Sequence, residues 1–377
     1  YLAGSLLRGL GSDNVDARLR RAEFVNTTGV QWLGTSIASL STLQRVLVVG
    51  SNLRKDHPLF AQRVRQAVRH GAQVNAIVSA GQLAKADAWA MPVANSLVTG
   101  VSGWAQALAD VAAVIAAEKG VAAPAAGASS AQAQAIAKSL LGGERKAILL
   151  GNGAAHHANA SSLLALANWI GEQTGASVGY LSEAANTVGT QWAKAQPQTG
   201  GKNAAQMLDG SLKAVLLLNT EPEFDTAAGT AAVAALDKAE MVVTLSPFKA
   251  NMAFSDVLLP IAPFTETSGS FVNAEGRLQS FHAVVKPRGE TRPAWKVLRV
   301  LGNLLDVPGF NFETSQDVLA KVTAQPIALS NAISADVRLA GAVSEPAVAA
   351  IYQLDGIVRR AASLQQTADA RATKEVA

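Results

Sequence analysis

The stretch at residues 146–170, KAILLGNG followed by AAHHANASSLLALANWI, indicates the fold most clearly. A short apolar run at Ala147–Leu150 leads into a glycine turn and then a long helical pattern, which is the order strand, turn, helix. Comparable apolar runs recur at Val46–Val49, Val74–Val78, Val178–Leu181, Val215–Leu218, Met241–Leu245 and Val257–Leu259. Several are apolar throughout, as strands covered on both faces should be. The sequence therefore predicts an α/β fold with parallel-sheet lobes flanked by helices.

A stretch of small residues at 120–134, GVAAPAAGASSAQAQ, interrupts this alternation and is typical of a linker. We therefore expect a first α/β lobe over residues 1–120, an Ala/Gly-rich linker over 121–134, and a second α/β lobe over 135–310. Beyond Pro308 the strand pattern fades, which predicts a helical or irregular extension over 311–377.

Composition excludes several classes of site. The 377 residues contain no cysteine, which rules out disulfides, thiolate metal sites, cysteine-ligated iron–sulfur clusters and cysteine nucleophiles within them. The net charge is +4 without a Lys/Arg run, so a nucleic-acid partner is not expected. No stretch approaches the roughly 18–20 apolar residues of a spanning helix, so no direct membrane span is expected.

The glycine turn at Gly151 and Gly153 has two interpretations. Glycines at the start of a helix let backbone N–H groups approach a phosphate. However, His156 stands where the third glycine of GxGxxG belongs, so a tight strand-to-helix turn is favoured. His156 and His157 would diverge by about 100° on a helix and could not both ligate one metal, so local hydrogen bonds or exposure to solvent are expected for them.

Two polar loops follow predicted strands. The loop at 50–58, GSNLRKDHP, lies where open α/β sheets bind ligands, but Asp56 before Pro58 also suits a helix cap, which is the favoured interpretation. The acidic loop at 219–225, NTEPEFD, offers carboxylates for general acid–base chemistry. Because no partner group accompanies them in the sequence, a solvated turn is favoured there.

The most distinctive block runs from Ser255 to Gln279. Glycines and Asn273 mark tight turns in it that present Glu275 and Arg277 side by side. Such a pair can bind an anion or form an ion pair within the protein. The internal ion pair is favoured because no phosphate-binding glycine motif precedes the loop.

This block resembles the molybdopterin oxidoreductase family, whose members carry ADVVLP, an acidic residue and GTFTNxEGRxQ in this order. Three further segments resemble the C-terminal part of one member, the large iron–sulfur subunit of NADH:quinone oxidoreductase (respiratory complex I; the 75 kDa type). They are Leu10–Arg20, similar to LGxxNxDxRxR, Val49–Pro58, similar to VGSNLRxxHP, and Ile351–Thr367, similar to a terminal IVRRAxxLQxT stretch.

The resemblance implies a fold like domains 2 and 3 of formate dehydrogenase and DMSO reductase. It also implies a structural, cofactor-free scaffold that is not itself catalytic, with the iron–sulfur clusters in an N-terminal region outside this sequence carrying electrons from NADH toward quinone. The expected partners are other subunits of the peripheral arm, on the cytoplasmic side of a bacterial inner membrane. No catalytic or metal-ligating residue is expected. The residues expected to remain from a pterin site are Gly151, Asn152, Gly153, His156, Asn273, Glu275 and Arg277.

Two alternatives remain open. The chain could be part of a molybdopterin-dependent oxidoreductase similar to formate dehydrogenase, with the loops at 151–157 and 273–277 gripping the cofactor's phosphates. A stand-alone nucleotide-binding enzyme is less favoured, because each glycine motif is incomplete.

Overall fold

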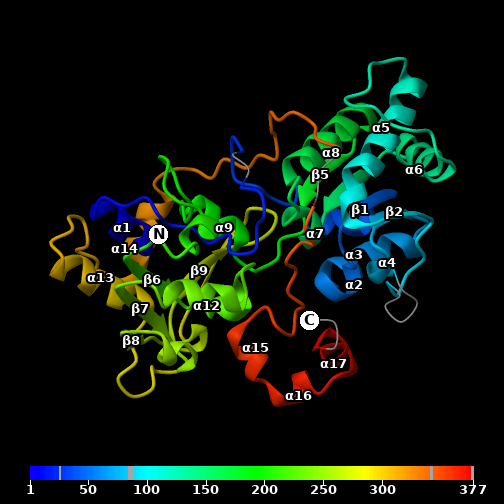
Figure 1. Cartoon of the computed structure of the whole chain (residues 1–377). Helices are drawn as coiled ribbons and strands as arrows, with labels where there is room; N and C mark the ends of the chain where they lie inside the picture. The colour runs from blue at the N-terminus through cyan, green and yellow to red at the C-terminus, as the bar shows by residue number, and fades with distance from the viewer. Residues whose placement is uncertain (25–26, 84–88, 340–342, 375–377) are drawn as a thin grey trace.

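Two parallel β-sheets, each accompanied by helices, form two lobes (Figure 1). The computed structural model describes residues 1–24, 27–83, 89–339 and 343–374. The larger lobe contains a five-stranded sheet and the smaller lobe a three-stranded sheet, and a two-stranded hairpin forms a third, separate sheet. The predicted α/β class with parallel sheets flanked by helices is confirmed.

The five strands of the larger lobe are parallel and follow the order β3-β2-β1-β4-β5. They are β1 Arg45–Val49, β2 Gln73–Val78, β3 Asn95–Val98, β4 Lys146–Leu150 and β5 Ser177–Tyr180. The strand order reverses between β1 and β4, and in open α/β sheets ligands bind at the carboxyl ends of the strands at such a point. Val49 pairs with Leu150, so the loops that follow β1 and β4 leave the sheet side by side.

Helices bury both faces of this sheet. They are η1 Ala38–Thr42, α3 Pro58–Arg69, α5 Trp104–Lys119, α6 Ala131–Leu141 and α8 Ala160–Thr174. Helices α5, α6 and α8 pack with Leu47 and Ile148 on one face, whereas η1 and α3 pack with Val46 and Ala147 on the other. All four strand residues are fully buried, which explains why the strands lack polar alternation.

The smaller lobe contains the parallel strands β6, β7 and β8 in that order. They span Ala214–Leu218, Met241–Ser246 and Val257–Pro260. Its core joins distant parts of the sequence, because α1 (Leu2–Gly9) supplies Leu2 and Leu6 while α13 (Ala294–Leu304) supplies Leu298. The chain therefore starts in the smaller lobe, builds the larger lobe over residues 38–180, and returns.

This topology corrects the lobe boundary expected at 121–134. Strand β4 follows that stretch in the sequence, yet it pairs with β1 in the same sheet. Residues 121–130 form a mostly exposed loop that contacts α5, and 131–134 begin α6. In the loop, Asp110 Oδ1 accepts a hydrogen bond from the Ala128 N–H, and a Cβ on Gly127 would lie only 2.4 Å from the Ala109 oxygen. The small side chains thus allow close packing on α5, which composition alone cannot distinguish from flexibility.

The remaining elements are short. The helices among them are α2 Leu53–Asp56, α4 Ala80–Leu83, η3 Val101–Gly103, α7 Asn152–Ala155, α9 Thr187–Trp192, α10 Ala204–Met207, α11 Pro222–Asp225, α12 Thr230–Leu236, η4 Ala250–Ala253, η5 Phe264–Glu266 and α14 Ser315–Thr323. The hairpin consists of β9 Gly269–Val272 and β10 Leu278–Phe281. Within the described ranges, no helix is long and apolar enough to cross a membrane.

After α14 the chain returns to the larger lobe. Leu329 forms a β-bridge with Val30, and Asn331 Nδ2 donates hydrogen bonds to the backbone oxygens of Trp32 and Val178. The described part of the chain ends in α15 Gly356–Arg360, α16 Ala362–Gln365 and α17 Ala368–Lys374. Figure 1 shows these three helices in red, below and between the two lobes.

Candidate functional site

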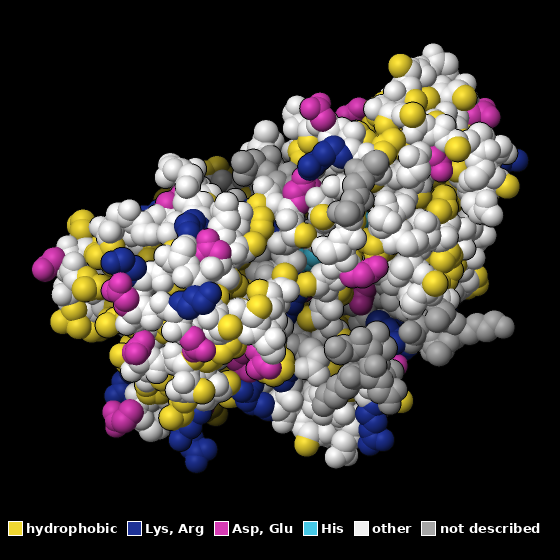
Figure 2. All heavy atoms as spheres, viewed as in Figure 1, with side chains coloured by type: hydrophobic (Ala, Val, Ile, Leu, Met, Phe, Trp, Pro, Cys, Tyr) yellow, Lys and Arg dark blue, Asp and Glu magenta, His cyan; other side chains and the backbone are white. Residues whose placement is uncertain are grey.

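A cavity of about 390 Å³ lies between the lobes, beside the carboxyl ends of β4, β5 and β6. Its size is within the range of roughly 300–1,000 Å³ that is usual for small-molecule sites. Figure 2 shows the hollow between the lobes, with histidine atoms in it and acidic and basic side chains interspersed on the surrounding face. The ionisable side chains that line the cavity are Arg18, Arg20, Arg21, His156, Tyr180, Glu183, Glu221, Asp225, Asp355 and Arg359.

A continuous series of contacts between acidic and basic side chains crosses this cavity. We call it the cleft network, and it consists of His156, Glu183, Arg20, Asp225, Arg359, Glu221 and Arg360. His156 Nε2 lies 3.2 Å from one oxygen of Glu183, and the other oxygen lies 3.0 Å from Arg20 Nη1. Arg20 Nη2 in turn lies 3.6 Å from Asp225 Oδ1. The series thus leads from the end of β4 to the loop after β6.

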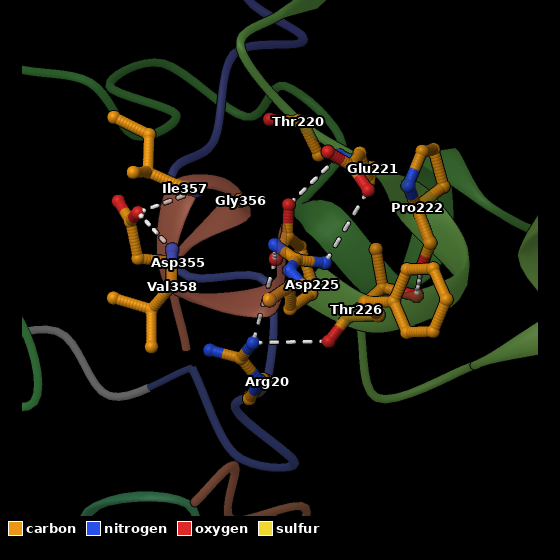
Figure 3. A network of polar contacts seen from close by, with 12 residues as sticks. Arg20, Thr220, Glu221, Pro222, Asp225, Thr226, Asp355, Gly356, Ile357 and Val358 are labelled. Atoms are coloured by element: carbon orange, nitrogen blue, oxygen red, sulfur yellow. Dashed lines mark hydrogen bonds and ion pairs between the residues drawn. The ribbon is translucent and has the colours of Figure 1, made fainter. Parts of the chain in front are cut away.

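Helix α15, the first of the three helices described after residue 355, completes the network. Arg359 Nη2 donates to Asp225 Oδ1 over 2.6 Å, and Arg360 Nη1 donates to Glu221 Oε1 over 2.8 Å. Figure 3 shows Arg20 and the turn at Asp355–Val358 on different sides of the two carboxylates. The carboxylates of the smaller lobe are therefore bound by arginines from both ends of the sequence.

This arrangement corrects the solvated turn expected at 219–225. Glu221 is only 7% exposed. Pro222 begins the short helix α11, and the Glu221 N–H donates to Asp225 Oδ2 over 2.7 Å, so the loop folds back on itself and both carboxylates face the cavity. A polar composition indicates a turn, but its burial depends on Arg359 and Arg360, which lie more than 130 residues further along the chain.

Besides Arg21, whose pKa is lowered by burial, two groups that line the cavity have an altered pKa, Glu183 and Tyr180. Burial tends to raise the pKa of Glu183, but the neighbouring His156 and Arg20 outweigh it and hold the pKa below its ordinary value. Glu183 is therefore a carboxylate at neutral pH. Burial raises the pKa of Tyr180 to about 12, which keeps its phenol protonated. Neither group has the pKa near neutrality that general acid–base catalysis favours.

The first group of sequence-predicted residues borders this cavity, although its glycines serve packing. Asn152 and His156 line the cavity. A Cβ on Gly151 would lie 2.2 Å from Ser51 Cβ, and one on Gly153 would lie 2.7 Å from the Gly50 oxygen. The glycines thus let the loops after β1 and β4 contact each other, which agrees with the favoured tight turn.

The helical pattern after this turn is interrupted, which corrects the long helix expected from residue 154 onward. Helix α7 ends at Ala155 and α8 begins at Ala160. His157 lies in the interruption: its Nδ1 accepts from the Asn159 N–H over 2.9 Å, which leaves Nε2 to donate to the Val101 oxygen over 3.1 Å. The expected local hydrogen bonding is thus confirmed for His157, while His156 instead joins the cleft network.

The loop at 50–58 is held by internal capping. Asn52 Oδ1 accepts from the Lys55 N–H, and Asp56 Oδ2 accepts from Ser51 Oγ and the Asn52 N–H. The expected cap on the following helix is therefore wrong: Asn52 caps the short helix α2 within the loop, Asp56 bonds back to residues 51 and 52, and the N-cap residue of α3, His57, makes no side-chain cap bond. Sequence order alone does not show which way the Asp56 side chain turns.

His57 makes the protein sensitive to acid. Burial lowers its pKa from 6.5 to about 4, so the unfolded chain binds a proton at pH values where the folded chain does not. The stabilising contribution is present above pH 6.5 and is lost as the pH falls toward 4. We expect the free energy of unfolding to fall by roughly 3 kcal/mol over this interval because of His57. Urea unfolding of His57→Gln should show a shallower pH dependence, whereas the exposed His70→Gln should match the wild type.

The second group of predicted residues lies away from the cavity. Asn273, Glu275 and Arg277 form the turn between β9 and β10, and none of them lines the cavity between the lobes. Arg277 Nε lies 3.1 Å from Glu275 Oε1, which confirms the internal ion pair, and Glu275 Oε2 accepts from the Ile37 N–H over 2.7 Å. The structure therefore does not bring the loops at 151–157 and 273–277 together around one cavity.

Sequence reasoning missed Glu183, Arg20 and Arg359 as site residues. Arg20 and Arg359 lie in segments that carry the family resemblance, but the motifs alone did not indicate what these arginines bind. Nothing in the sequence around Glu183 distinguishes it from an exposed acid. Its position is set by β5, which directs the following loop into the cavity.

The chemistry available in the cavity is limited by these pairings. Glu183, Glu221 and Asp225 are each bound to an arginine, and Asp355 caps α15 through the N–H groups of residues 357 and 358. A carboxylate held in this way is a poor base, because accepting a proton would break its ion pair. Among the residues that the structure describes, no group of three His, Asp or Glu side chains could hold a metal ion.

Comparison with known proteins agrees with this architecture. The G-type subunit of NADH-quinone oxidoreductase of Streptomyces coelicolor is 29% identical over 304 residues, covering 73% of this chain and 34% of that protein. The mitochondrial 78 kDa subunit of NADH-ubiquinone oxidoreductase of Candida albicans is 44% identical over 54 residues, covering 14% and 8%. A putative formate dehydrogenase of Staphylococcus aureus is 31% identical over 90 residues, covering 24% and 9%. The chain spans about a third or less of the length of these relatives.

The family model for molybdopterin oxidoreductases matches residues 1–304. This match covers both sheets, the cavity-lining loops after β4 to β6 and the distinctive hairpin block. The chain belongs to the molybdopterin oxidoreductase family.

Proposed function

We propose that this chain is a structural, cofactor-free portion of the iron–sulfur subunit of an NADH:quinone oxidoreductase. The similarity over 73% of the chain to the Streptomyces coelicolor relative supports this assignment. The scaffold role is supported by the residues that line the cavity between the lobes, which bind one another. Its carboxylates are paired with arginines of the same chain, and its glycine turn is filled by packing.

A molybdopterin cofactor does not fit these residues. Its phosphates would need free cations, but three of the four arginines that line the cavity are in ion pairs, Arg18 with Asp16, Arg20 with Glu183, and Arg359 with Asp225. The fourth, Arg21, donates a hydrogen bond to Gln31 Oε1. The carboxylates of Glu183, Glu221 and Asp225 would also repel an anion placed in the cavity. The N–H groups of Gly151 and Gly153 already donate to the Val49 and Gly50 oxygens, each over 2.9 Å, so a phosphate would have to displace these bonds to the end of β1 and the loop after it.

In this proposal the electron carriers lie outside these 377 residues, and the two lobes provide packing surface. The chain contains no cysteine, so it cannot supply thiolate ligands to an ordinary iron–sulfur cluster. Its partners are other subunits of the peripheral arm of the complex. Its location is peripheral, on the cytoplasmic side of a bacterial inner membrane.

The purified chain is expected to be colourless, to contain no stoichiometric iron or molybdenum, and not to oxidise NADH. Elemental analysis and an NADH oxidation assay with an artificial electron acceptor test this directly. NADH oxidation by the chain alone would contradict the scaffold role, as would one molybdenum atom per chain.

The alternative is a pterin-binding part of an oxidoreductase similar to formate dehydrogenase. It is favoured by the 31% identity over 90 residues to a putative formate dehydrogenase, and by two buried side chains at the cavity. Asn152 Oδ1 and His156 Nδ1 have no hydrogen-bond partner within the described residues. A bound cofactor would satisfy such atoms, and stoichiometric molybdenum would decide for this alternative.

A further inference from the structure

Two carboxylates and two aromatic rings on the smaller lobe form a site suited to guanidinium groups. Glu221 and Asp225 come from the loop after β6, and their side chains are only 9% and 15% exposed. The ring of Phe224 lies between them in sequence, and Phe248 follows β7. Carboxylates bind guanidinium through charge-assisted hydrogen bonds, and aromatic rings stack on its planar face.

Helix α15 of the same chain places two arginines in this site. The Arg359 side chain is 8% exposed, and its Cζ lies 5.1 Å from the centre of the Phe224 ring. The Cζ of Arg360 lies 3.9 Å from the centre of the Phe248 ring. Each arginine therefore combines a carboxylate with a ring, which makes the pair more specific than a surface ion pair.

The start of α15 is shaped for this contact. Asp355 Oδ1 accepts hydrogen bonds from the N–H groups of Ile357 and Val358, which fixes the first turn. A Cβ on Gly356 would lie 3.1 Å from both Glu221 Oε1 and a ring carbon of Phe248, so glycine lets the helix approach closely. Figure 3 shows this turn facing the two carboxylates.

The segment that carries α15 is attached to the larger lobe on either side. Before α15, the Arg338 N–H donates to Ser162 Oγ at the start of α8, over 2.9 Å. After α15, Asp369 in α17 lies 3.5 Å from Arg54 in α2. The chain therefore leaves the larger lobe, contacts the smaller lobe through Arg359 and Arg360, and returns.

From this geometry we infer that α15 acts as a built-in ligand of the cleft, whose two arginines hold the lobes together around the cavity. The cleft network links this contact to the larger lobe, because Asp225 lies close to Arg20, which is bound to Glu183 beside His156. The inference is independent of the proposed function, since a held cleft would also restrict access in a catalytic relative.

The test compares Arg359→Met with Arg371→Met in the full chain. Both remove one arginine from the C-terminal helices, but Arg371 is exposed and lies outside the cleft network. Hydrogen–deuterium exchange of the segments at 219–226 and 355–360 should become at least tenfold faster in Arg359→Met and stay as in the wild type in Arg371→Met. Unchanged exchange at 219–226 in Arg359→Met would overturn the inference.

A distance measurement tests the bridging itself. Because the chain has no cysteine, Gln62→Cys on α3 and Asp237→Cys after α12 would be its only thiols, and both positions are exposed. Spin labels there should give one narrow distance distribution between the lobes, which broadens in Arg359→Met and remains narrow in Arg371→Met. If Arg359→Met fails to fold, Arg359→Lys takes its place, because lysine keeps the positive charge but lacks the planar guanidinium. The distance distribution of this variant should be broader than that of the wild type. A distribution identical to the wild type in a folded Arg359 variant would contradict the bridge.

Discussion

Replacing Glu183 with alanine is expected to lower the free energy of unfolding by about 3–5 kcal/mol. The carboxylate lies between Arg20 and His156, and its removal leaves a buried guanidinium without its 3.0 Å partner. The Arg20 side chain is only 9% exposed, so water cannot fully replace the lost interaction. Urea denaturation at pH 7, followed by circular dichroism, measures the change.

The matched control for this prediction is Glu172→Ala. Glu172 is an exposed residue of α8 in the same lobe, and its removal should change the free energy of unfolding by less than about 0.5 kcal/mol. Equal effects of the two variants would mean that the cleft network contributes no more than a surface charge.

Replacing Gly179 with alanine should be similarly damaging, for a steric reason. Gly179 lies in β5, and a Cβ there would be 2.0 Å from the backbone carbon and oxygen of Leu33. Residues 32–34 lie close to β5, where the Tyr180 N–H donates a hydrogen bond to the Trp32 oxygen over 2.9 Å. A clash with backbone cannot be relieved by a rotamer change, so we expect a loss of about 3 kcal/mol or more.

A comparison with Gly100→Ala isolates this steric effect. Gly100 has φ of −60° and no heavy atom near the position of an added Cβ, so alanine fits there without strain. Thermal unfolding should show a clearly lower melting temperature for Gly179→Ala alone. A wild-type melting temperature for that variant would show that residues 32–34 do not pack on β5 as described.

The apolar runs predicted the two parallel sheets well because burial on both faces leaves an unambiguous pattern. All seven runs lie in strands, to within one residue at their ends. Strand β3, Asn95–Val98, was not predicted because it is a half-exposed edge strand with only two apolar residues. The lobe boundary was misplaced because pairing between β1 and β4 is a contact between residues about 100 positions apart, which no local pattern encodes.

The candidate site was predictable only in part, for the same reason. Local sequence identified the turns at 151–153 and 273–277 and the ion pair of Glu275 with Arg277. It could not identify the burial of Glu221, because the arginine that binds it comes from α15 near the end of the chain. The partners of a buried ion pair come together only in the folded chain. A sequence motif can therefore contain one of the partners without showing what it binds.

The central claim is that the chain's own arginines pair the carboxylates of the cavity between the lobes, and that this cavity holds no pterin cofactor. The most direct measurement is the molybdenum and pterin content per chain, determined on the intact complex purified from cells supplied with molybdate. Our account predicts neither in stoichiometric amount, together with iron that resides outside these 377 residues. One molybdenum and an equimolar amount of pterin bound by this chain would contradict it.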